Sequence, residues 1–143
     1  MKTSKAFDSD VQRHERPSST TFSTKSRIQS FKYAFSGLSL MLKSQHNAWL
    51  HAVATFCVVI LGLVCGLSSG EWCWLVLAIM AVWTAEALNT ALEFLADVTS
   101  PEFHPLIKKA KDVAAGAVLL SALGSVIIAL LVLGPRLCSM LFS

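Results

Sequence analysis

A long stretch without charged residues is the feature that most limits what this chain can fold into. Between Lys43 and Glu71 the sequence contains no Asp, Glu, Lys or Arg. Its apolar centre, residues 48–67, would form about 30 Å of α-helix, which matches the hydrocarbon thickness of a bilayer. Hydrophobic types make up 54% of the 143 residues and charged types only 15%. This balance argues against a disordered chain and against a soluble enzyme with a charged surface.

Two more apolar segments follow the first. The second runs from Trp72 to about residue 98, and Thr99–Pro101 interrupts it. The third, residues 113–133, carries no charge and stops at Gly134-Pro135. We therefore expect an all-α integral membrane protein with transmembrane helices at about 48–68, 72–98 and 113–133.

The segment before the first span has the pattern of a surface helix. Over residues 27–44 the apolar side chains recur at spacings of three and four, while Lys32 and Lys43 lie off that stripe. The stripe consists of Ile28, Phe31, Phe35, Leu38 and Leu42. A basic amphipathic helix of this kind is expected to lie in the membrane interface. Residues 1–26 are polar and aperiodic, and they predict a disordered cytoplasmic tail ahead of one domain at 27–143.

The lysines and arginines predict the orientation of the spans. They gather in residues 1–43 and again at 108–111, whereas the turn near residues 66–71 holds only Glu71. Basic residues favour the cytoplasmic side. The amino terminus is therefore expected in the cytoplasm and the carboxyl terminus outside. Because nothing basic faces a soluble surface with aromatics interleaved, nucleic acid is not an expected partner.

The second span carries a stripe of polar residues. They are Glu86, Asn89, Thr90, Glu93 and Asp97, at positions i, i+3, i+4, i+7 and i+11. At about 100° per residue they share one face of a helix. Each carboxylate would cost at least about 2.5–3.5 kcal/mol facing lipid, so the stripe must face protein, water, a metal or a ligand. Glu93 and Asp97 are expected at the cytoplasmic surface, with Glu86 about 10 Å deeper.

These residues, with the lysines that follow, have the makings of a phosphoryl-transfer site. Such a site needs a metal, cations around phosphate and a base for the attacking hydroxyl. A surface carboxylate can hold Mg²⁺, and the buried Glu86 can act as a base. Other interpretations stay open: the lysines could only set topology, and Asn89 and Thr90 could only join helices. The stripe could also be part of a proton or cation path through an oligomer.

Two histidines lie near the first span, and a row of small residues lies on the third. His46 and His51 are interpreted as interfacial polar residues rather than metal ligands. The small-residue stripe consists of Ala110, Ala114, Ala117, Ser121 and Gly124. Such a stripe allows close helix contact, and we interpret it as a packing surface.

Three motifs resemble the prokaryotic diacylglycerol kinase family, which includes the undecaprenol kinases. They are Glu86-x-x-Asn89-Thr90-Ala-Leu-Glu93-x-x-x-Asp97, Glu102-Phe-His104-Pro and Ala110-Lys111-Asp112-x-x-Ala-Gly-Ala-Val118. The resemblance covers roughly residues 27–137. It implies a lipid kinase of the bacterial inner membrane that works as a homotrimer with sites shared between subunits. ATP would be the co-substrate and Mg²⁺ the cofactor.

The resemblance also implies roles for individual residues. Glu86 would be the general base for the lipid hydroxyl, and Glu93 would hold Mg²⁺ with the ATP phosphates. Contacts to ATP would come from Tyr33, Glu93, Glu102, Phe103, His104, Lys111 and Asp112, with Asn89, Thr90 and Asp97 in support. Gln45 stands where the family usually has a second metal-binding Glu. We therefore expect an active enzyme with a higher Mg²⁺ demand; the alternative is an enzyme impaired by the loss of this metal-binding charge.

The acceptor follows from resemblance alone. The segment around His51 and the Asn89-Thr90-Ala, His104-Pro and Ala-Gly-Ala-Val forms are similar to the undecaprenol kinase branch. This favours undecaprenol as the lipid alcohol. Diacylglycerol is the alternative acceptor, because both lipids would present a hydroxyl at the same depth.

Overall fold

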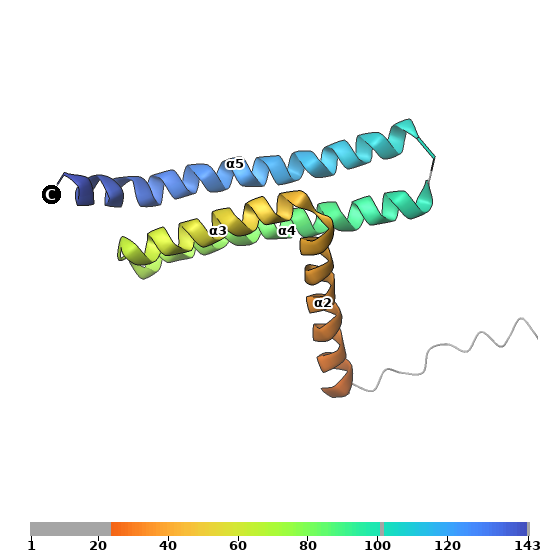
Figure 1. Ribbon diagram of the computed structural model, residues 1–143, viewed down its shortest axis with the longest axis horizontal. Coiled ribbons are helices and arrows are strands. Elements are labelled where there is room, and N and C mark those ends of the chain that lie inside the picture. Colours follow the sequence, from red (N-terminus) through yellow and green to blue (C-terminus); the bar gives the residue numbers. More distant parts are fainter. Residues whose placement is uncertain (1–23, 101, 143) are drawn as a thin grey trace, which may run out of the picture. The chain divides into compact units, whose positions relative to one another are not determined.

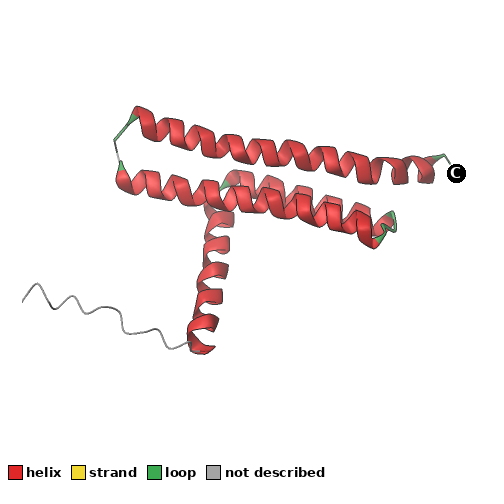
Figure 2. Ribbon diagram, turned by 180° about the vertical axis from the view of Figure 1, so that it is seen from behind, coloured by secondary structure: helices red, strands yellow, loops and turns green. Residues whose placement is uncertain are grey.

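The computed structural model describes residues 24–100 and 102–142, and every regular element in this part of the chain is an α-helix (Figures 1 and 2). The elements are α2 (Thr24–Ser44), α3 (His46–Val64), α4 (Ser69–Thr99) and α5 (Pro105–Leu141). Helices α3, α4 and α5 are each long and apolar enough to cross a membrane. The expected all-α membrane fold is confirmed, and the chain is a multi-pass membrane protein.

Helix α2 spans the boundary between two compact units, which divide after Ser36. In the first unit, the apolar side chains of Ile28, Phe31 and Phe35 are exposed along one face. Such a face suits the membrane interface, and that placement stays a prediction. The predicted tail at 1–26 lies outside the described residues up to position 23. Its last three residues are helical, because α2 begins at Thr24.

A short turn joins α3 to α4. Gly66 has a φ of +62°, a left-handed conformation that glycine adopts without strain. A Cβ at Gly62 would lie 2.8 Å from the ring of Trp72, so glycine there lets the two helices approach closely. Ser68 and Glu71 form a reciprocal capping box that starts α4 at Ser69. The second helix therefore begins before the predicted residue 72, and the first ends before the predicted 68.

Helix α5 differs most from the sequence prediction. The predicted stop at Gly134-Pro135 is wrong, because the helix runs through Pro135 to Leu141. A proline inside a helix costs about 3 kcal/mol or more. Contacts hold the helix on both sides of the proline: Leu133 before it and Leu137 after it pack with the buried Leu75, and Arg136 is bound by Glu71 of α4.

The three spans lie side by side in the second unit (Figure 1). Helix α4 packs chiefly against α5 and less against α3. Hydrogen bonds within the spans join the helices: Ser125 Oγ donates to the Ala78 carbonyl (2.9 Å), and Trp83 Nε1 donates to Thr55 Oγ1 (3.1 Å). Small and polar residues are the usual contacts between membrane helices. This packing turns the polar face of α4 inward.

Candidate active site

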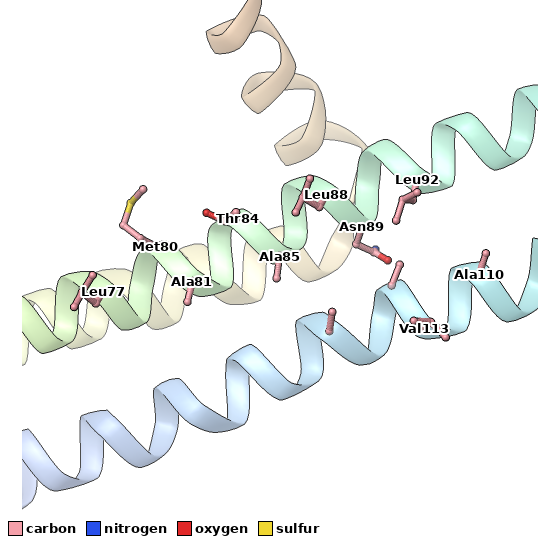
Figure 3. Close-up of a pocket in the computed structure, with 12 residues that line it drawn as sticks. Leu77, Met80, Ala81, Thr84, Ala85, Leu88, Asn89, Leu92, Ala110 and Val113 are labelled. Atoms are coloured by element: carbon pink, nitrogen blue, oxygen red, sulfur yellow. The ribbon is translucent and has the colours of Figure 1, made fainter.

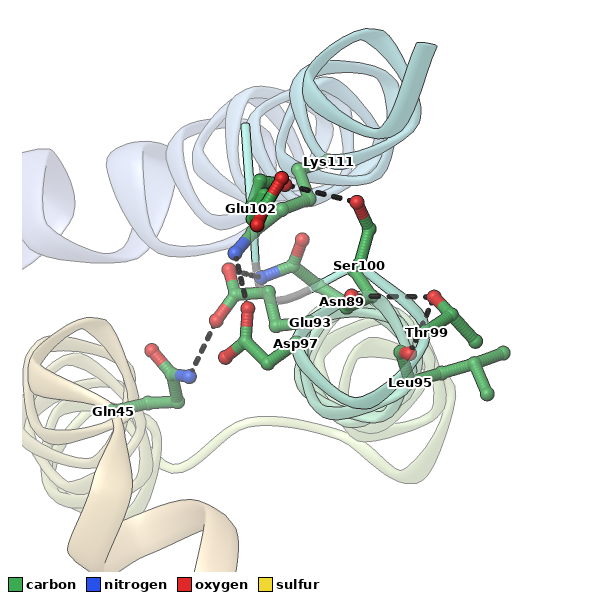
Figure 4. Close-up of polar contacts among 10 residues, drawn as sticks. Gln45, Asn89, Glu93, Leu95, Asp97, Thr99, Ser100, Glu102 and Lys111 are labelled. Carbon is green, nitrogen blue, oxygen red and sulfur yellow. Dashed lines mark hydrogen bonds and ion pairs between the residues drawn. The ribbon is translucent and has the colours of Figure 1, made fainter. Parts of the chain in front are cut away.

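The polar stripe of α4 runs from the interior of the bundle to its surface. Glu86 (1% exposed), Asn89 (6%) and Thr90 are buried. Glu93, one turn further on, is half-buried, and the Asp97 side chain is 67% exposed. The helical spacing predicted one shared face, and the structure gives that face a gradient of burial. Figure 4 shows the outer members of the stripe with their partners, Gln45 just before α3 and Lys111 of α5.

Glu93 is held by two amides. Gln45 Nε2 donates to Glu93 Oε2 at 2.6 Å, and Asn89 Nδ2 donates to Oε1 at 2.9 Å (Figure 4). Gln45 is the residue that precedes α3, with an extended backbone, and its side chain caps no helical amide. It is therefore free to reach across to α4. Both donors are neutral, so the negative charge of Glu93 has hydrogen bonds but no cation among these partners.

Glu86 has a different environment. Its side chain is almost completely buried, and among the described residues neither carboxyl oxygen has a hydrogen-bond partner. The Thr90 hydroxyl bonds to the backbone carbonyl of Glu86 and leaves the carboxyl group alone. His51 Nε2 of α3 lies 3.9 Å from Glu86 Oε2. A buried carboxyl group without partners is costly in a structural role, and such a group is suited to receive a ligand.

The lysines of α5 contact two of the predicted site carboxylates. Lys111 Nζ lies 3.0 Å from Asp97 Oδ1, which joins the beginning of α5 to the end of α4 (Figure 4). Lys108 Nζ lies 2.6 Å from Asp112 Oδ2, one turn along α5. Both pairs are well exposed, and exposed ion pairs exchange partners at a cost of about 0–1 kcal/mol. These lysines can therefore leave their carboxylates for a phosphate.

The connection before α5 presents a second group of predicted site residues. Glu102, Phe103 and His104 are all exposed, and Phe103 is 80% exposed. The Glu102 carbonyl accepts a hydrogen bond from Ser100 Oγ. His104 precedes the first residue of α5, and its Nδ1 accepts from the Leu106 amide at 3.3 Å. The ring is thus fixed as a helix cap, with Phe103 open to the surroundings.

Tyr33 belongs to the other compact unit. There its hydroxyl accepts a hydrogen bond of 2.8 Å from Gln29 Nε2, and the side chain is exposed. Its predicted contact with the nucleotide stays a prediction.

The residues near Glu93 fit a magnesium ion. Within the described residues there is no cluster of three His, Cys, Asp or Glu that could hold a metal. Mg²⁺ needs no such cluster, because it keeps several waters and is bound by one or two carboxylates with substrate phosphates. Glu93 supplies one carboxylate. Gln45 donates its nitrogen here, and a half-turn of the amide would present Oε1 instead. Both are hard oxygen ligands, as Mg²⁺ requires.

A groove runs between α4 and α5 (Figure 3). Its volume is about 690 Å³, and it is lined almost entirely by apolar residues, with Thr84 and Asn89 as the polar ones. Three members of the small-residue stripe line it: Ala110, Ala114 and Ala117. Ala114 is buried, whereas Ala110 and Ala117 are exposed. The stripe therefore packs against α4 only in part and leaves an open apolar surface beside the site.

The sequence interpretation of His51 as an interfacial polar residue missed its contact with Glu86. The hydrogen bond between Gln45 and Glu93 fixes the alignment of the antiparallel helices α3 and α4. Six residues along α3 from Gln45 and seven back along α4 from Glu93 advance about 9 and 10.5 Å. His51 and Glu86 occupy those positions. The pattern of one helix carries no signal for this pair, because the pairing depends on the alignment of α3 and α4 that the Gln45–Glu93 hydrogen bond fixes.

Comparisons with known proteins give one family. The model of the family described as prokaryotic diacylglycerol kinase matches residues 32–133. The chain is 40% identical over 110 residues to an undecaprenol kinase of Bacillus subtilis, covering 77% of this chain and 89% of the relative. It is 38% identical over 115 residues to a diacylglycerol kinase of Synechocystis, covering 80% and 66%. A diacylglycerol kinase of Helicobacter pylori is 33% identical over 106 residues, covering 69% and 83%.

Proposed function

This chain belongs to the prokaryotic diacylglycerol kinase family and is a lipid kinase, and we propose that it uses ATP and Mg²⁺ to phosphorylate undecaprenol. The reaction would take place at the cytoplasmic face of the bacterial inner membrane. The observation that carries the proposal is the buried Glu86, whose carboxyl oxygens have no hydrogen-bond partner among the described residues. It lies two turns below Glu93 on the same helix face, where a lipid hydroxyl can meet a phosphate.

Glu86 acts as the general base. It takes the proton of the lipid hydroxyl while that oxygen attacks the γ-phosphorus of ATP. The bond between the γ-phosphorus and the bridging oxygen breaks, and its electron pair leaves with ADP. The products are the lipid phosphate, ADP and one proton, which Glu86 gives up to water. The burial of Glu86 excludes bulk water as a competing acceptor of the phosphoryl group.

Glu93 and Gln45 would hold Mg²⁺, whose chemistry is to neutralise charge on the phosphates. Lys111 leaves Asp97 and contacts phosphate as a point charge. Asn89 keeps Glu93 oriented through the 2.9 Å hydrogen bond, and Thr90 fixes the backbone turn at Glu86. The remaining nucleotide contacts are assigned to Tyr33, Glu102, Phe103, His104 and Asp112.

The acceptor is proposed from the relatives. The Bacillus subtilis relative is named an undecaprenol kinase, and its 40% identity spans 89% of its length. Diacylglycerol is the second candidate, because the Synechocystis relative, named a diacylglycerol kinase, is 38% identical. Both acceptors are hydrophobic alcohols that reach Glu86 from the bilayer.

A homotrimer is the proposed assembly. In the most apolar stretch of each span, only 11% is buried inside the chain in α3 and in α5, and 33% in α4. The apolar groove beside Asn89 offers surface for a neighbouring helix. The lysines at the start of α5 lie at the same end of the bundle as Glu93, which supports a cytoplasmic position for this end under the positive-inside rule. The carboxyl terminus would then lie outside.

The test is phosphate transfer from labelled ATP by the purified full-length chain in detergent. Undecaprenol and diacylglycerol are supplied in parallel, Mg²⁺ is titrated, and Glu86→Gln is the matched control. Transfer to undecaprenol in preference, lost in the control, would support the proposal. Preferred transfer to diacylglycerol would replace the acceptor. No transfer to either lipid at any Mg²⁺ concentration, from an intact oligomer, would overturn the proposal and favour a proton- or cation-conducting oligomer.

A further inference from the structure

His51 is brought from α3 to the buried carboxyl group of Glu86. Its Nε2 lies 3.9 Å from Glu86 Oε2, and the imidazole side chain is 18% exposed. The two polar neighbours of Glu86 on α4 are occupied elsewhere. The Thr90 hydroxyl donates to a backbone carbonyl, and the Asn89 amide nitrogen donates to Glu93. The imidazole is therefore placed to bond the Glu86 carboxyl group from the neighbouring helix.

The position of His51 follows from a regular alignment of α3 and α4. Gln45 is hydrogen-bonded to Glu93, and Thr55 is hydrogen-bonded to Trp83. The second bond lies ten residues forward along the chain from Gln45 and ten residues back along α4 from Glu93. A rise of about 1.5 Å per residue keeps two antiparallel helices in step over this length. His51 and Glu86 lie between these two hydrogen bonds. The contact is thus held from both sides, which limits sliding of the imidazole past the carboxyl group.

We propose that His51 is a positioning residue for Glu86. Its Nε2–H donates a hydrogen bond to Oε2 when the acceptor lipid is bound, and this leaves Oε1 to accept the proton of the lipid hydroxyl. The inference rests on the proposed role of Glu86 as the base. His51 gains and loses no proton in the step. The proton passes from the hydroxyl to Oε1 and then to water.

The observed distance is about 1 Å longer than a hydrogen bond. Hydrogen bonds of catalytic groups are often long in unliganded sites and tighten in the substrate complex. The terminal torsion of a glutamate is broad, so an unbonded carboxyl group samples many orientations. One N–H donor on Oε2 would fix the plane of the carboxyl group and the direction of Oε1. A general base oriented by a third group is a recurring arrangement in enzymes.

A structural role in joining α3 to α4 is the competing explanation, and the chain provides a control for it. Thr55 lies one turn from His51 on the same helix and accepts the hydrogen bond from Trp83 of α4. Thr55→Val removes this interhelical bond without touching Glu86. A merely structural loss should therefore appear in Thr55→Val as well as in a His51 variant.

The experiment measures kcat and KM for the full-length enzyme with ATP and its lipid acceptor. His51→Leu should lower kcat by about 10- to 100-fold, by analogy with the cost of removing a partner that orients a metal-binding side chain, with KM for ATP unchanged. His51→Gln, which keeps an N–H donor, should restore part of kcat. Thr55→Val should keep kcat. In the Glu86→Gln background, His51→Leu should cause no further loss, because both changes remove the same function.

The outcomes separate this inference from the proposed function. Wild-type kcat in His51→Leu, beside a loss in Glu86→Gln, would overturn the positioning role and leave the proposed base in place. An equal loss in Thr55→Val, no recovery in His51→Gln, or losses that multiply in the double variant would also overturn it. Full activity in Glu86→Gln would remove the proposed base and this inference together.

Discussion

The carboxylates toward the two ends of α4 differ in how fully they are hydrogen-bonded. Near its start, Glu71 accepts hydrogen bonds from the Ser68 amide and hydroxyl and a forked pair from Arg136, all between 2.6 and 2.9 Å. Near its other end, Glu93 is held by two neutral amides, and the buried Glu86 carboxyl group has no hydrogen-bond partner in the part of the chain that the structure describes. The hydrogen-bonding capacity of Glu71 is filled, whereas that of Glu86 and Glu93 is not.

This difference indicates which end is structural and which end acts on ligands. Glu71 and Arg136 satisfy each other in a forked geometry that leaves little for a ligand to add. Glu86 and Glu93 keep capacity for a hydroxyl and a cation. Full satisfaction of polar groups stabilises a fold, whereas unsatisfied buried groups need a functional reason. Four substitutions would break or sharpen this contrast.

Glu86→Gln should have the largest effect. Removing a general base lowers kcat by about 10²- to 10⁴-fold, while the amide keeps the size of the buried side chain. The midpoint of thermal unfolding should not fall, because the carboxyl group forms no hydrogen bond with residues 24–100 or 102–142 that the variant could lose. Steady-state kinetics and a thermal melt of the same preparation measure both. A drop in stability with activity retained would place Glu86 with Glu71 as a structural group.

Gln45→Glu should lower the Mg²⁺ concentration for half-maximal rate by about tenfold, equivalent to about 1.4 kcal/mol of binding free energy. It restores an anion beside Glu93, where the amide nitrogen now lies 2.6 Å from Oε2. Without Mg²⁺ the two carboxylates repel, so the thermal midpoint should fall and recover when Mg²⁺ is added. Gln45→Met is the uncharged control of similar length. An unchanged Mg²⁺ requirement would remove Gln45 and Glu93 as the metal ligands.

Glu71→Gln should change stability and leave catalysis intact. The variant loses the charge that the Arg136 guanidinium binds through two hydrogen bonds. We expect a decrease of a few degrees in the thermal midpoint, which becomes smaller in high salt because exposed charges are screened. The value of kcat per folded enzyme should equal that of the wild type. A loss of kcat without a loss of stability would contradict the structural assignment of this end.

The sequence was sufficient for the parts that depend on one helix alone. Helical periodicity placed Glu86, Asn89, Thr90, Glu93 and Asp97 on one face, and α4 buries the part of that face that carries Glu86, Asn89 and Thr90. The three long apolar segments were found for the same reason. Ser68 and Glu71 could also have been interpreted as a capping box, since that motif is local.

Features that need two helices were not predictable. Beyond Pro135, Arg136 of α5 is bound by Glu71, which lies 65 residues away in the sequence. The contact of His51 with Glu86 depends on how α3 and α4 are aligned. Gln45 was predicted as a metal ligand, and only the fold shows it donating to Glu93. Helical periodicity predicts the helix face on which a residue lies, whereas the packing of the helices decides which residue it contacts.

Asp97→Asn should have the smallest effect. Asp97 is bound by Lys111 at 3.0 Å, but Asp97 is exposed and Lys111 partly exposed, so the pair contributes about 0–1 kcal/mol. If Asp97 only holds Lys111 until a phosphate arrives, the variant frees this lysine and KM for ATP should stay the same or fall slightly. Lys111→Met is the comparison and should raise KM for ATP, because a cation beside the phosphates is lost. A rise in KM for ATP in both variants would show that Asp97 positions Lys111 in the ATP complex. The ion pair would then persist with ATP bound, rather than exist only in the absence of ATP.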